Sequence, residues 1–296
     1  MNIRTSHRRG IPLKERMGQG WYRFSRSKLS ILGLAGAALL VFAAVFAPII
    51  APYPHHAGKV VDFANANQPP SLQNLCGTDT MGRDVFSRII YALRSTLLMG
   101  VVVLSVAVPF GTSMGLIAGY FQGSLIDSLI TRLTDIFLAI PPLILALVVA
   151  SLLKPNLLNA MLAITVTWWT WYARLAYGMA TSLNREYYIR SAQLSGAGWI
   201  HIVFREMLPN CLSPILTKMT LDIGIVIMIG AALSFVGLGE QPPAPSLGTM
   251  ISDGAKYMPT QWWLTVFPAL TIMIIVLSFN LLGDSFRDLF STEEKK

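Results

Sequence analysis

Long apolar runs alternate with short charged segments along the chain. Five runs contain no charged residue, and a sixth carries Lys218 and Asp222 near its start. A helix rises about 1.5 Å per residue, so about 20 apolar residues match the ~30 Å hydrocarbon core of a bilayer. The pattern predicts an all-α membrane protein with six transmembrane helices, at residues 30–51, 95–119, 136–153, 157–173, 212–238 and 262–283.

Composition supports spanning helices over other folds. The 296 residues are 53% hydrophobic and only 13% charged, against about 25% charged in soluble domains. The runs are too long and alternate too little to be barrel strands, and lipid requires backbone groups to be satisfied within the segment. A helical bundle is therefore expected.

Basic residues predict the orientation of this bundle. Residues 1–29 contain eight Lys or Arg and one acid, Glu15, and cytoplasmic segments are enriched in basic residues. The amino terminus is predicted inside, with Trp21 and Phe24 in an interfacial elbow. The first run has 22 residues, too many for a signal peptide, so it is expected to be an anchor. With six spans, the tail at 287–296 also lies inside.

The net charge follows from this topology. The chain carries a formal net charge of +8, and basic loops at the cytoplasmic face interact with anionic lipid headgroups. Membrane lipids are therefore expected partners and nucleic acid is not. Two outer segments are predicted, at 52–94 and 239–261. In the first, Thr78 or Asp79 is expected to cap a helix that leads to the second span, and Arg83 and Asp84 are expected to hold that helix in place.

Metal and redox chemistry are not indicated. His55 and His56 are adjacent on the outer segment without carboxylate or sulfur ligands at a defined spacing, so we expect ordinary loop residues. Cys76 is predicted outside and Cys211 at the cytoplasmic edge of the fifth span, so the two cannot pair, and neither lies in a CxxC spacing. An impermeant thiol reagent is expected to label Cys76 from outside and to spare Cys211.

Two features interrupt the apolar runs. Pro141 and Pro142 bend the third span, because each removes a backbone donor. The bend is either a packing kink or the flank of a translocation path. Lys218 and Asp222 are four residues apart, so they share a helix face, and a structural ion pair is favoured over a functional one.

Aromatic residues gather at two predicted span ends. Trp168, Trp169, Trp171 and Tyr172 lie at the inner end of the fourth span, and Trp262 and Trp263 open the sixth at the outer face. Aromatic rings are enriched at both membrane interfaces. We interpret both groups as aromatic belts.

The loop at 178–211 is the longest inside. Small residues and glycines around Gly196 end one short helix, apolar residues at Ile200 and Val203 begin another at helical spacing, and Leu208-Pro209 closes the unit. The loop is thus predicted to contain two short helices joined by a tight turn. A soluble partner that binds such a unit can move the helices to which it is attached.

This loop resembles the EAA loop of ABC importer permeases, in which Glu-Ala-Ala stands six residues before a Gly and Leu-Pro closes the pattern. Aligned on Gly196, Ala192 matches the second alanine, Ser191 the first, and Arg190 the glutamate, so the acidic residue is missing. The resemblance implies an ATPase-coupling role for Ser191, Ala192, Ser195, Gly196, Ala197, Gly198, Arg205, Leu208 and Pro209.

Four further stretches, at 77–84, 135–142, 233–239 and 279–288, look like the second, C-type permease of dipeptide, oligopeptide and nickel importers. The resemblance implies a type I ABC importer permease-like bundle with its core at 95–286, in a bacterial inner membrane. It also implies a second homologous permease, two cytoplasmic ATPase subunits and a periplasmic solute-binding protein as partners.

No phosphate loop is present in the sequence. Gly58-Lys59 lacks both the first glycine and the following hydroxyl residue of that motif. The chain is expected to bind no cofactor and to have no catalytic site, with ATP hydrolysed by partner subunits. The expected function is a path for peptides. The alternatives are import of nickel or another small solute, or ion-coupled secondary transport, for which Asp222 is the only candidate carboxylate.

Overall fold

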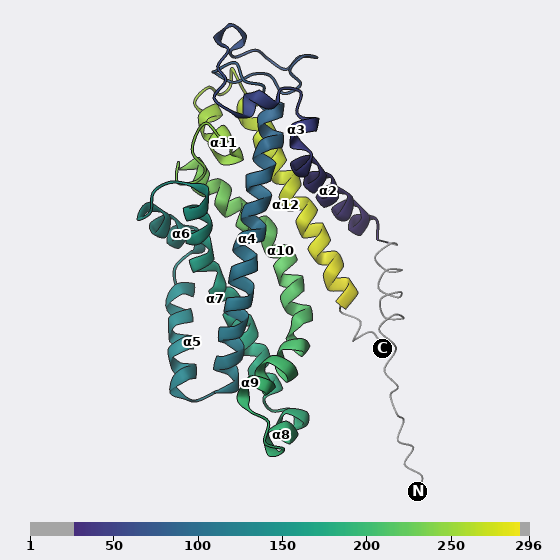
Figure 1. Cartoon of the computed structure of the whole chain (residues 1–296), viewed down its shortest axis with the longest axis vertical. Helices are drawn as coiled ribbons and strands as arrows, with labels where there is room; N and C mark the ends of the chain where they lie inside the picture. Colours follow the sequence, from purple (N-terminus) through teal and green to yellow (C-terminus); the bar gives the residue numbers. More distant parts are fainter. Residues whose placement is uncertain (1–26, 291–296) are drawn as a thin grey trace.

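A computed structural model describes residues 27–290, which form an elongated bundle of helices (Figure 1). The longest helices are α4, α7, α10 and α12. One end, called the inner end, bears α8 and α9, and the other, called the outer end, bears residues 52–84 and α11. The helices are α2 (Lys28–Val45), α3 (Ala47–Ile50), η1 (Pro54–Ala57), η2 (Phe63–Asn65), α4 (Val85–Tyr120), α5 (Leu125–Leu138), α6 (Pro142–Ser151), α7 (Leu157–Leu183), α8 (Tyr187–Leu194), α9 (Trp199–His201), η3 (Ile202–Met207), α10 (Leu208–Phe235), α11 (Leu247–Ala255) and α12 (Trp263–Phe290).

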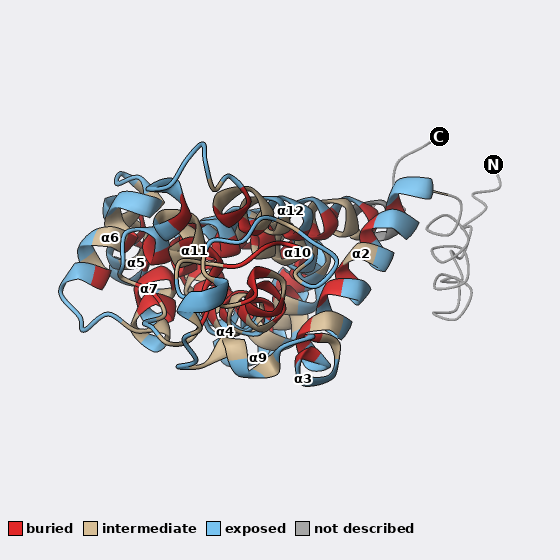
Figure 2. Ribbon diagram, turned by 90° about the horizontal axis from the view of Figure 1, so that it is seen from above, coloured by how far each residue is buried: buried red, intermediate tan, exposed pale blue. Residues whose placement is uncertain are grey.

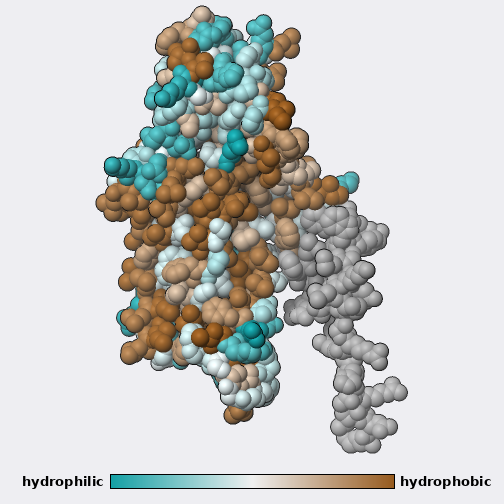
Figure 3. Space-filling view, viewed as in Figure 1, coloured by the Kyte–Doolittle hydropathy of each residue, from teal (hydrophilic) through white to brown (hydrophobic). Residues whose placement is uncertain are grey.

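The surface is apolar around its middle and polar toward its ends (Figure 3). Large aliphatic side chains project from this middle band, among them Leu39 of α2 and Leu129 of α5, which are 66% and 71% exposed. A soluble monomer rarely exposes so much contiguous apolar surface. The band matches a chain whose middle lies in lipid or against other membrane helices.

The number of spans differs from six when it is judged by length and apolarity. Four helices of the described chain satisfy both criteria, or five if α5 and α6 together count as one. α7 is not among them, although it has 27 residues. It carries Asn159, Arg174 and several threonines, which lower its apolarity. The all-α membrane architecture is confirmed, and the count of six is not reached by this measure.

A seam of glycines joins α4 to α7 at the centre of the bundle. Gly111, Gly115 and Gly119 recur every fourth residue along one face of α4. A Cβ on any of them would overlap α7, at the backbone of Trp169 and Ala173 or at the side chain of Ala180. Small residues at this spacing let two membrane helices approach closely. Buried residues accordingly concentrate in α4, α7 and α10 (Figure 2).

Several helices are longer than the apolar runs that predicted them. α4 begins at Val85, ten residues before the apolar run that begins at Ser95. Its cap is Asp84, whose Oδ2 accepts a hydrogen bond from the Ser87 N–H at 2.7 Å, and not Thr78 or Asp79. α7 continues ten residues past the end of its run, and α12 continues to Phe290, inside the predicted tail. A helix can extend beyond its apolar run because its backbone hydrogen bonds form equally well where charged side chains face water.

The predicted third span is two helices. α5 and α6 meet at an angle of 91° across a break of a few residues. Pro141 lies at the N-cap of α6 and Pro142 at its first position, where a missing N–H costs no helical bond. The two prolines therefore end one helix and start another, so the predicted bend at Pro141 and Pro142 is a break, and α5 and α6 together still satisfy the criteria for one broken span. The predicted elbow at Trp21 and Phe24 lies outside the described residues.

Candidate functional site

The inner end carries a helical hairpin, here defined as α8, the turn at Gly196, α9 and η3. Gly196 has a φ of +82°, which favours glycine. The turn is closed by two backbone hydrogen bonds, from Gly196 N–H to the Gln193 carbonyl at 3.0 Å and from Ala197 N–H to the Ala192 carbonyl at 3.1 Å. The predicted tight turn after a short helix is confirmed.

The hairpin does not end at Leu208-Pro209. Residues 199–235 form one uninterrupted helix of 37 residues that includes α9, η3 and α10. The π-helical turns of η3 directly precede Pro209, whose ring and missing N–H disfavour regular α-helical bonding. The prediction that this dipeptide closes the unit was wrong, and the second arm of the hairpin belongs to the same helix as the fifth span.

The hairpin is anchored by apolar residues on one side and exposed on the other. Ile189, Ile202 and Val203 are completely buried in the main core. Tyr187 and Leu194, by contrast, are 84% and 90% exposed. Exposed large apolar side chains at the tip of a rigid element are typical of a surface that another protein covers.

The residues aligned with the coupling loop fall on both sides of this hairpin. Ala192, Ala197 and Leu208 pack partly buried against the core. The others are exposed: Ser191, Ser195, Gly196, Gly198, Arg205 and Pro209. The fold thus gathers the predicted residues into one unit with an anchoring side and an open side, and their coupling role stays a prediction.

A buried polar centre links α7 to α10. Asp222 is 2% exposed, and its Oδ1 accepts a hydrogen bond from Lys218 Nζ at 3.1 Å. Its Oδ2 accepts two more, from Trp168 Nε1 at 3.0 Å and from the Tyr172 hydroxyl at 2.8 Å. The predicted ion pair is confirmed. Its two aromatic donors were not foreseen.

These donors overturn much of the predicted inner aromatic belt. Trp168, Trp169 and Tyr172 are buried, and only Trp171 of that group is exposed. At the outer end, Trp263 is also buried and donates its Nε1 hydrogen bond to the Thr78 carbonyl at 3.2 Å. The N–H groups of Trp168 and Trp263 and the hydroxyl of Tyr172 therefore satisfy acceptors within the protein, and not the lipid interface.

A second ion pair joins α5 to α7. Arg174 Nη2 contacts Asp135 Oδ1, and the two side chains are 42% and 60% exposed. The apolar runs were delimited at these two charges, at Ile136 and Ala173, so both residues were expected outside the spans. They were missed as a pair because nothing in one sequence connects positions 39 residues apart.

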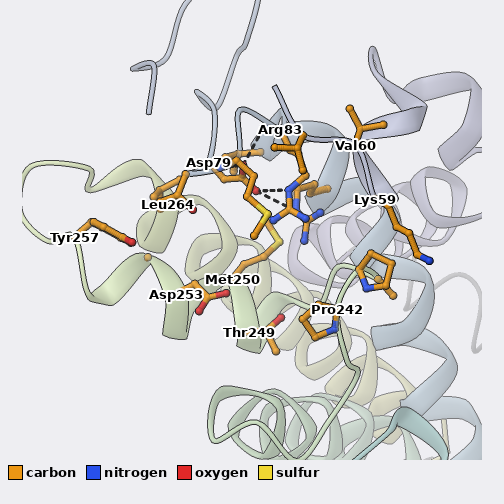
Figure 4. A pocket seen from close by; sticks show the side chains of 18 residues that line it. Lys59, Val60, Asp79, Arg83, Pro242, Thr249, Met250, Asp253, Tyr257 and Leu264 are labelled. Atoms are coloured by element: carbon orange, nitrogen blue, oxygen red, sulfur yellow. Dashed lines mark hydrogen bonds and ion pairs between the residues drawn. The ribbon is translucent and has the colours of Figure 1, made fainter. Parts of the chain in front are cut away.

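The outer end contains a cavity of about 330 Å³ between residues 59–88, the loop after α10, and α11 (Figure 4). Asp79 Oδ2 pairs with Arg83 Nε at 2.7 Å and lies 3.7 Å from Arg88 Nε. Arg88 also donates a hydrogen bond to the His56 carbonyl at 3.1 Å. Asp79, Arg83 and Arg88 on the cavity wall therefore hold one another in place through ion pairs and a hydrogen bond.

His56 contributes to this bracing, since its Nδ1 accepts a hydrogen bond from the Asp84 N–H at 2.8 Å. Among residues 27–290 no group of three or more His, Cys, Asp or Glu side chains is placed to hold a metal ion. The expectation that Asp84 holds the start of α4 is confirmed by its capping bond. The outer segment is therefore a hydrogen-bonded cap over α4.

The two cysteines are free and buried. Burial, and secondly the charge of Asp84, raises the pKa of the Cys76 thiol to about 11. Thiol reagents attack the thiolate, which is scarce at neutral pH when the pKa is this high. Cys76 is therefore a poor reporter of the outer face, and the expected labelling from outside is not supported.

Comparison with known proteins accounts for nearly the whole chain. Residues 111–295 match the family described as binding-protein-dependent transport system inner membrane component, and residues 16–70 match the N-terminal TM domain of oligopeptide transport permease C. The chain belongs to this permease family. It is thus an inner-membrane component of an importer.

The similarity to relatives in this permease family extends over almost the full length of each protein. The dipeptide transport system permease protein DppC of Haemophilus influenzae is 39% identical over 93% of this chain and 94% of that protein. DppC of Escherichia coli K12 is also 39% identical, over 93% of each. The glutathione transport system permease protein GsiD of E. coli O6:K15:H31 is 38% identical over 90% of this chain and 88% of that protein.

A solved structure shares the fold of this permease. An inward-facing form of the MetNI methionine ABC transporter superimposes with a TM-score of 0.55 over 67% of this chain and 94% of that chain, at 20% sequence identity. The likeness confirms the expected bundle of an ABC importer permease.

Proposed function

We propose that this permease forms, with a second related permease, the path by which peptides cross the bacterial inner membrane. Two separate ATPase subunits supply the energy, a periplasmic binding protein delivers the solute, and this chain holds no cofactor or ATPase site of its own. The support is chemical: the relatives above are named for dipeptides and glutathione, which are all small peptides.

The observation that carries the mechanism is the continuity of the hairpin with α10. An ATPase that holds the exposed tip around Leu194 moves α9, and α9 is the first turn of the helix that continues to Phe235. Closure of two ATPases is then transmitted directly to a span, because no loop separates α9 from α10. The energy that drives the change is the difference in partner affinity between the two states of the hairpin.

The turn at Gly196 offers a direct test. No atom lies within 4 Å of a Cβ built there, so a substitution is strained by its positive φ and not by a clash. Gly196→Val introduces a β-branched residue into this conformation at a cost of about 1–3 kcal/mol. We expect binding-protein-stimulated ATP hydrolysis and dipeptide uptake to fall by about tenfold, the change that 1.4 kcal/mol produces, with normal amounts in the membrane.

Two variants control for this result. Gly196→Asn tolerates the left-handed conformation and should keep most activity. Gly123, in the turn between α4 and α5, has a φ of +83° and equally open surroundings, so Gly123→Val applies the same strain outside the hairpin and should stay coupled. Normal coupling in Gly196→Val, or equal loss in both valine variants, would contradict the hairpin mechanism.

Orientation requires new cysteines, because both native thiols are buried. In a chain without Cys76 and Cys211, a cysteine at Leu72, which is 98% exposed at the outer end, should react with an impermeant maleimide added to intact cells. A cysteine at Ser195 in the hairpin should react only after the membrane is permeabilised. The opposite pattern would invert the topology.

Substrate class is tested by uptake into vesicles that contain the complete importer. Radiolabelled dipeptide should accumulate with ATP and its binding protein and without an ion gradient. Accumulation of nickel in place of dipeptide would favour the nickel alternative, and accumulation that follows a proton or sodium gradient would favour secondary transport.

A further inference from the structure

The outer cavity contains a buried cation with unused hydrogen-bond donors. Arg88 lies near the start of α4 and lines the cavity, and it is 6% exposed. A guanidinium group has five N–H donors. Within residues 27–290 the Arg88 side chain donates one hydrogen bond, from Nη1 to the His56 carbonyl at 3.1 Å. In that part of the chain, Nε and Nη2 therefore have no hydrogen-bond acceptor.

Asp79 does not supply these acceptors, because both of its oxygens are already engaged. Oδ1 accepts hydrogen bonds from the Met81 and Arg83 N–H groups, both at 2.9 Å. Oδ2 accepts one from Arg83 Nε at 2.7 Å, and its distance of 3.7 Å from Arg88 Nε is too long for a hydrogen bond. Asp79 and Arg83 thus neutralise each other, and the charge of Arg88 has only a distant partner.

The unused nitrogens of Arg88 face open space. Among residues 27–290, five polar side-chain atoms are fully enclosed without a hydrogen-bond partner, and none of the five belongs to Arg88. Nε and Nη2 are therefore accessible, and the open volume that Arg88 borders is the outer cavity. A buried charge without a full set of partners is costly. These donors therefore favour an occupant of the cavity that brings acceptors.

The charges around the cavity favour an anion. Its wall carries two acids, and both are already paired, Asp79 as described above and Asp253 with Lys256 at 3.1 Å. Lys59 also lines the cavity, is exposed, and forms no side-chain hydrogen bond or ion pair within the described part of the chain. The unbalanced charge is therefore positive, and Arg88 and Lys59 carry it.

The volume and the other walls of the cavity fit a small molecule with an apolar body. The cavity measures about 330 Å³, near the lower end of the usual range for small-molecule sites. Most of the remaining walls are aliphatic (Figure 4), with side chains from Val60, Met81, Pro242, Pro243, Met250 and Leu264. A carboxylate matches the planar guanidinium through two parallel hydrogen bonds. A small carboxylate with an apolar body therefore satisfies both the charge and the walls.

We propose that the outer cavity binds the carboxylate end of a small peptide, with Arg88 as its charged partner. Nε and Nη2 donate in parallel to the two carboxylate oxygens, and the last side chain of the peptide contacts the aliphatic walls. The bond to the His56 carbonyl keeps the guanidinium group in place. This inference rests on the proposed import of peptides, because it names the part of the peptide that this chain recognises at its outer end.

Thiol protection tests this site in the assembled importer without its binding protein. In a chain without Cys76 and Cys211, Thr249→Cys places a thiol on the cavity wall, and a hydrophilic thiosulfonate reagent should modify it. N-acetyl-alanyl-alanine at about ten times its Kd should slow the reaction about tenfold, because only the free site reacts. N-acetyl-alanyl-alanine amide, which lacks the carboxylate, should leave the rate unchanged. Leu72→Cys, 98% exposed and outside the cavity, is the matched control and should react equally with and without either compound.

Variants of the cavity wall separate recognition from structure. Arg88→Lys keeps the positive charge but loses the planar fork, and it should raise the N-acetyl-alanyl-alanine concentration for half protection by about tenfold, the loss of one charge-assisted hydrogen bond. Lys59→Gln should raise that concentration by less than about fivefold, because an exposed charge is screened by water and salt. Met81→Trp keeps every hydrogen bond of Arg88 and fills part of the cavity, so it should abolish protection even if Arg88→Lys lowers the amount of importer in the membrane.

Three outcomes would overturn the carboxylate site: protection by neither compound, equal protection by the acid and the amide, and an unaltered half-protection concentration in both Arg88→Lys and Met81→Trp. If Met81→Trp weakens only the binding of the solute-binding protein, and free peptide gives no protection, the cavity belongs to a protein interface and the proposal fails. ATP-driven uptake of radiolabelled alanyl-alanine by the unaltered importer is measured in parallel. Uptake without protection defeats only the site, whereas protection without uptake defeats the proposed function.

Discussion

The two carboxylate–base pairs on either side of α7 use the same chemistry in opposite surroundings. Asp222 is buried and accepts hydrogen bonds from Lys218, Trp168 and Tyr172. Asp135 is mostly exposed and contacts Arg174. The first pair has its partners within the chain on two helices, and the second faces outward from the bundle.

The difference shows that burial separates a pair that holds two helices together from one that is open at the surface of the chain. A buried carboxylate with three donors cannot release any of them without leaving a polar group unpaired, which is costly. An exposed pair can exchange partners at little cost, because water or a charged solute replaces the lost contact. Three predictions test this contrast, and each measures the stability of the purified importer in detergent.

The largest effect is expected at the buried centre. Asp222→Leu should lower the free energy of unfolding by about 3–5 kcal/mol, because it leaves the Lys218 charge and two aromatic donors without their acceptor. The measurement is an unfolding titration with denaturant. Asp222→Leu combined with Lys218→Met removes both charges and should recover part of the loss. An unchanged free energy of unfolding in Asp222→Leu would mean that the buried polar centre does not stabilise the bundle.

A smaller loss is expected when one donor is removed. Tyr172→Phe deletes the hydroxyl that lies 2.8 Å from Asp222 Oδ2 and keeps the ring. The expected cost is about 1.5–3 kcal/mol, the usual range for a hydrogen bond to a charged group. Tyr187→Phe in the exposed hairpin is the matched control and should be neutral. Equal effects of the two variants would refute the special role of the buried hydroxyl.

The smallest effect on stability is expected at the exposed pair. Asp135→Asn should change the free energy of unfolding by less than about 1 kcal/mol, the usual range for an exposed ion pair. Asp253→Asn, at the exposed pair with Lys256, should be equally mild. If Asp135→Asn instead destabilises the protein as strongly as Asp222→Leu, both pairs are structural and the contrast fails.

Much of the architecture could be predicted from local sequence. Apolar runs located the membrane helices, and the glycine-rich turn at Gly196 predicted the hairpin, because both depend on neighbouring residues. The pairing of Lys218 with Asp222 was equally accessible, since four residues is one helical turn.

The missed features depend on contacts between distant segments or on hydrogen bonds. Tyr172 and Trp168 donate to a residue at least 50 positions away, so their aromatic character pointed to an interface that they do not occupy. The start of α4 was misplaced because Thr78, Asp79 and Asp84 can all cap a helix, and only the folded chain shows that Asp84 accepts the Ser87 N–H bond. Asp135 and Arg174 were excluded because a charge was taken as the end of a span.

The single helix at 199–235 joins the two ends of the bundle without an intervening loop. Its 37 residues give a length of about 55 Å at about 1.5 Å per residue. A tilt of about 10° would displace one end relative to the other by about 10 Å, the diameter of a helix with its side chains. The loop after Phe235 reaches Pro242 and Pro243 on the wall of the outer cavity. A small tilt imposed at the inner tip would thus be carried along the helix to the outer cavity and would change its width.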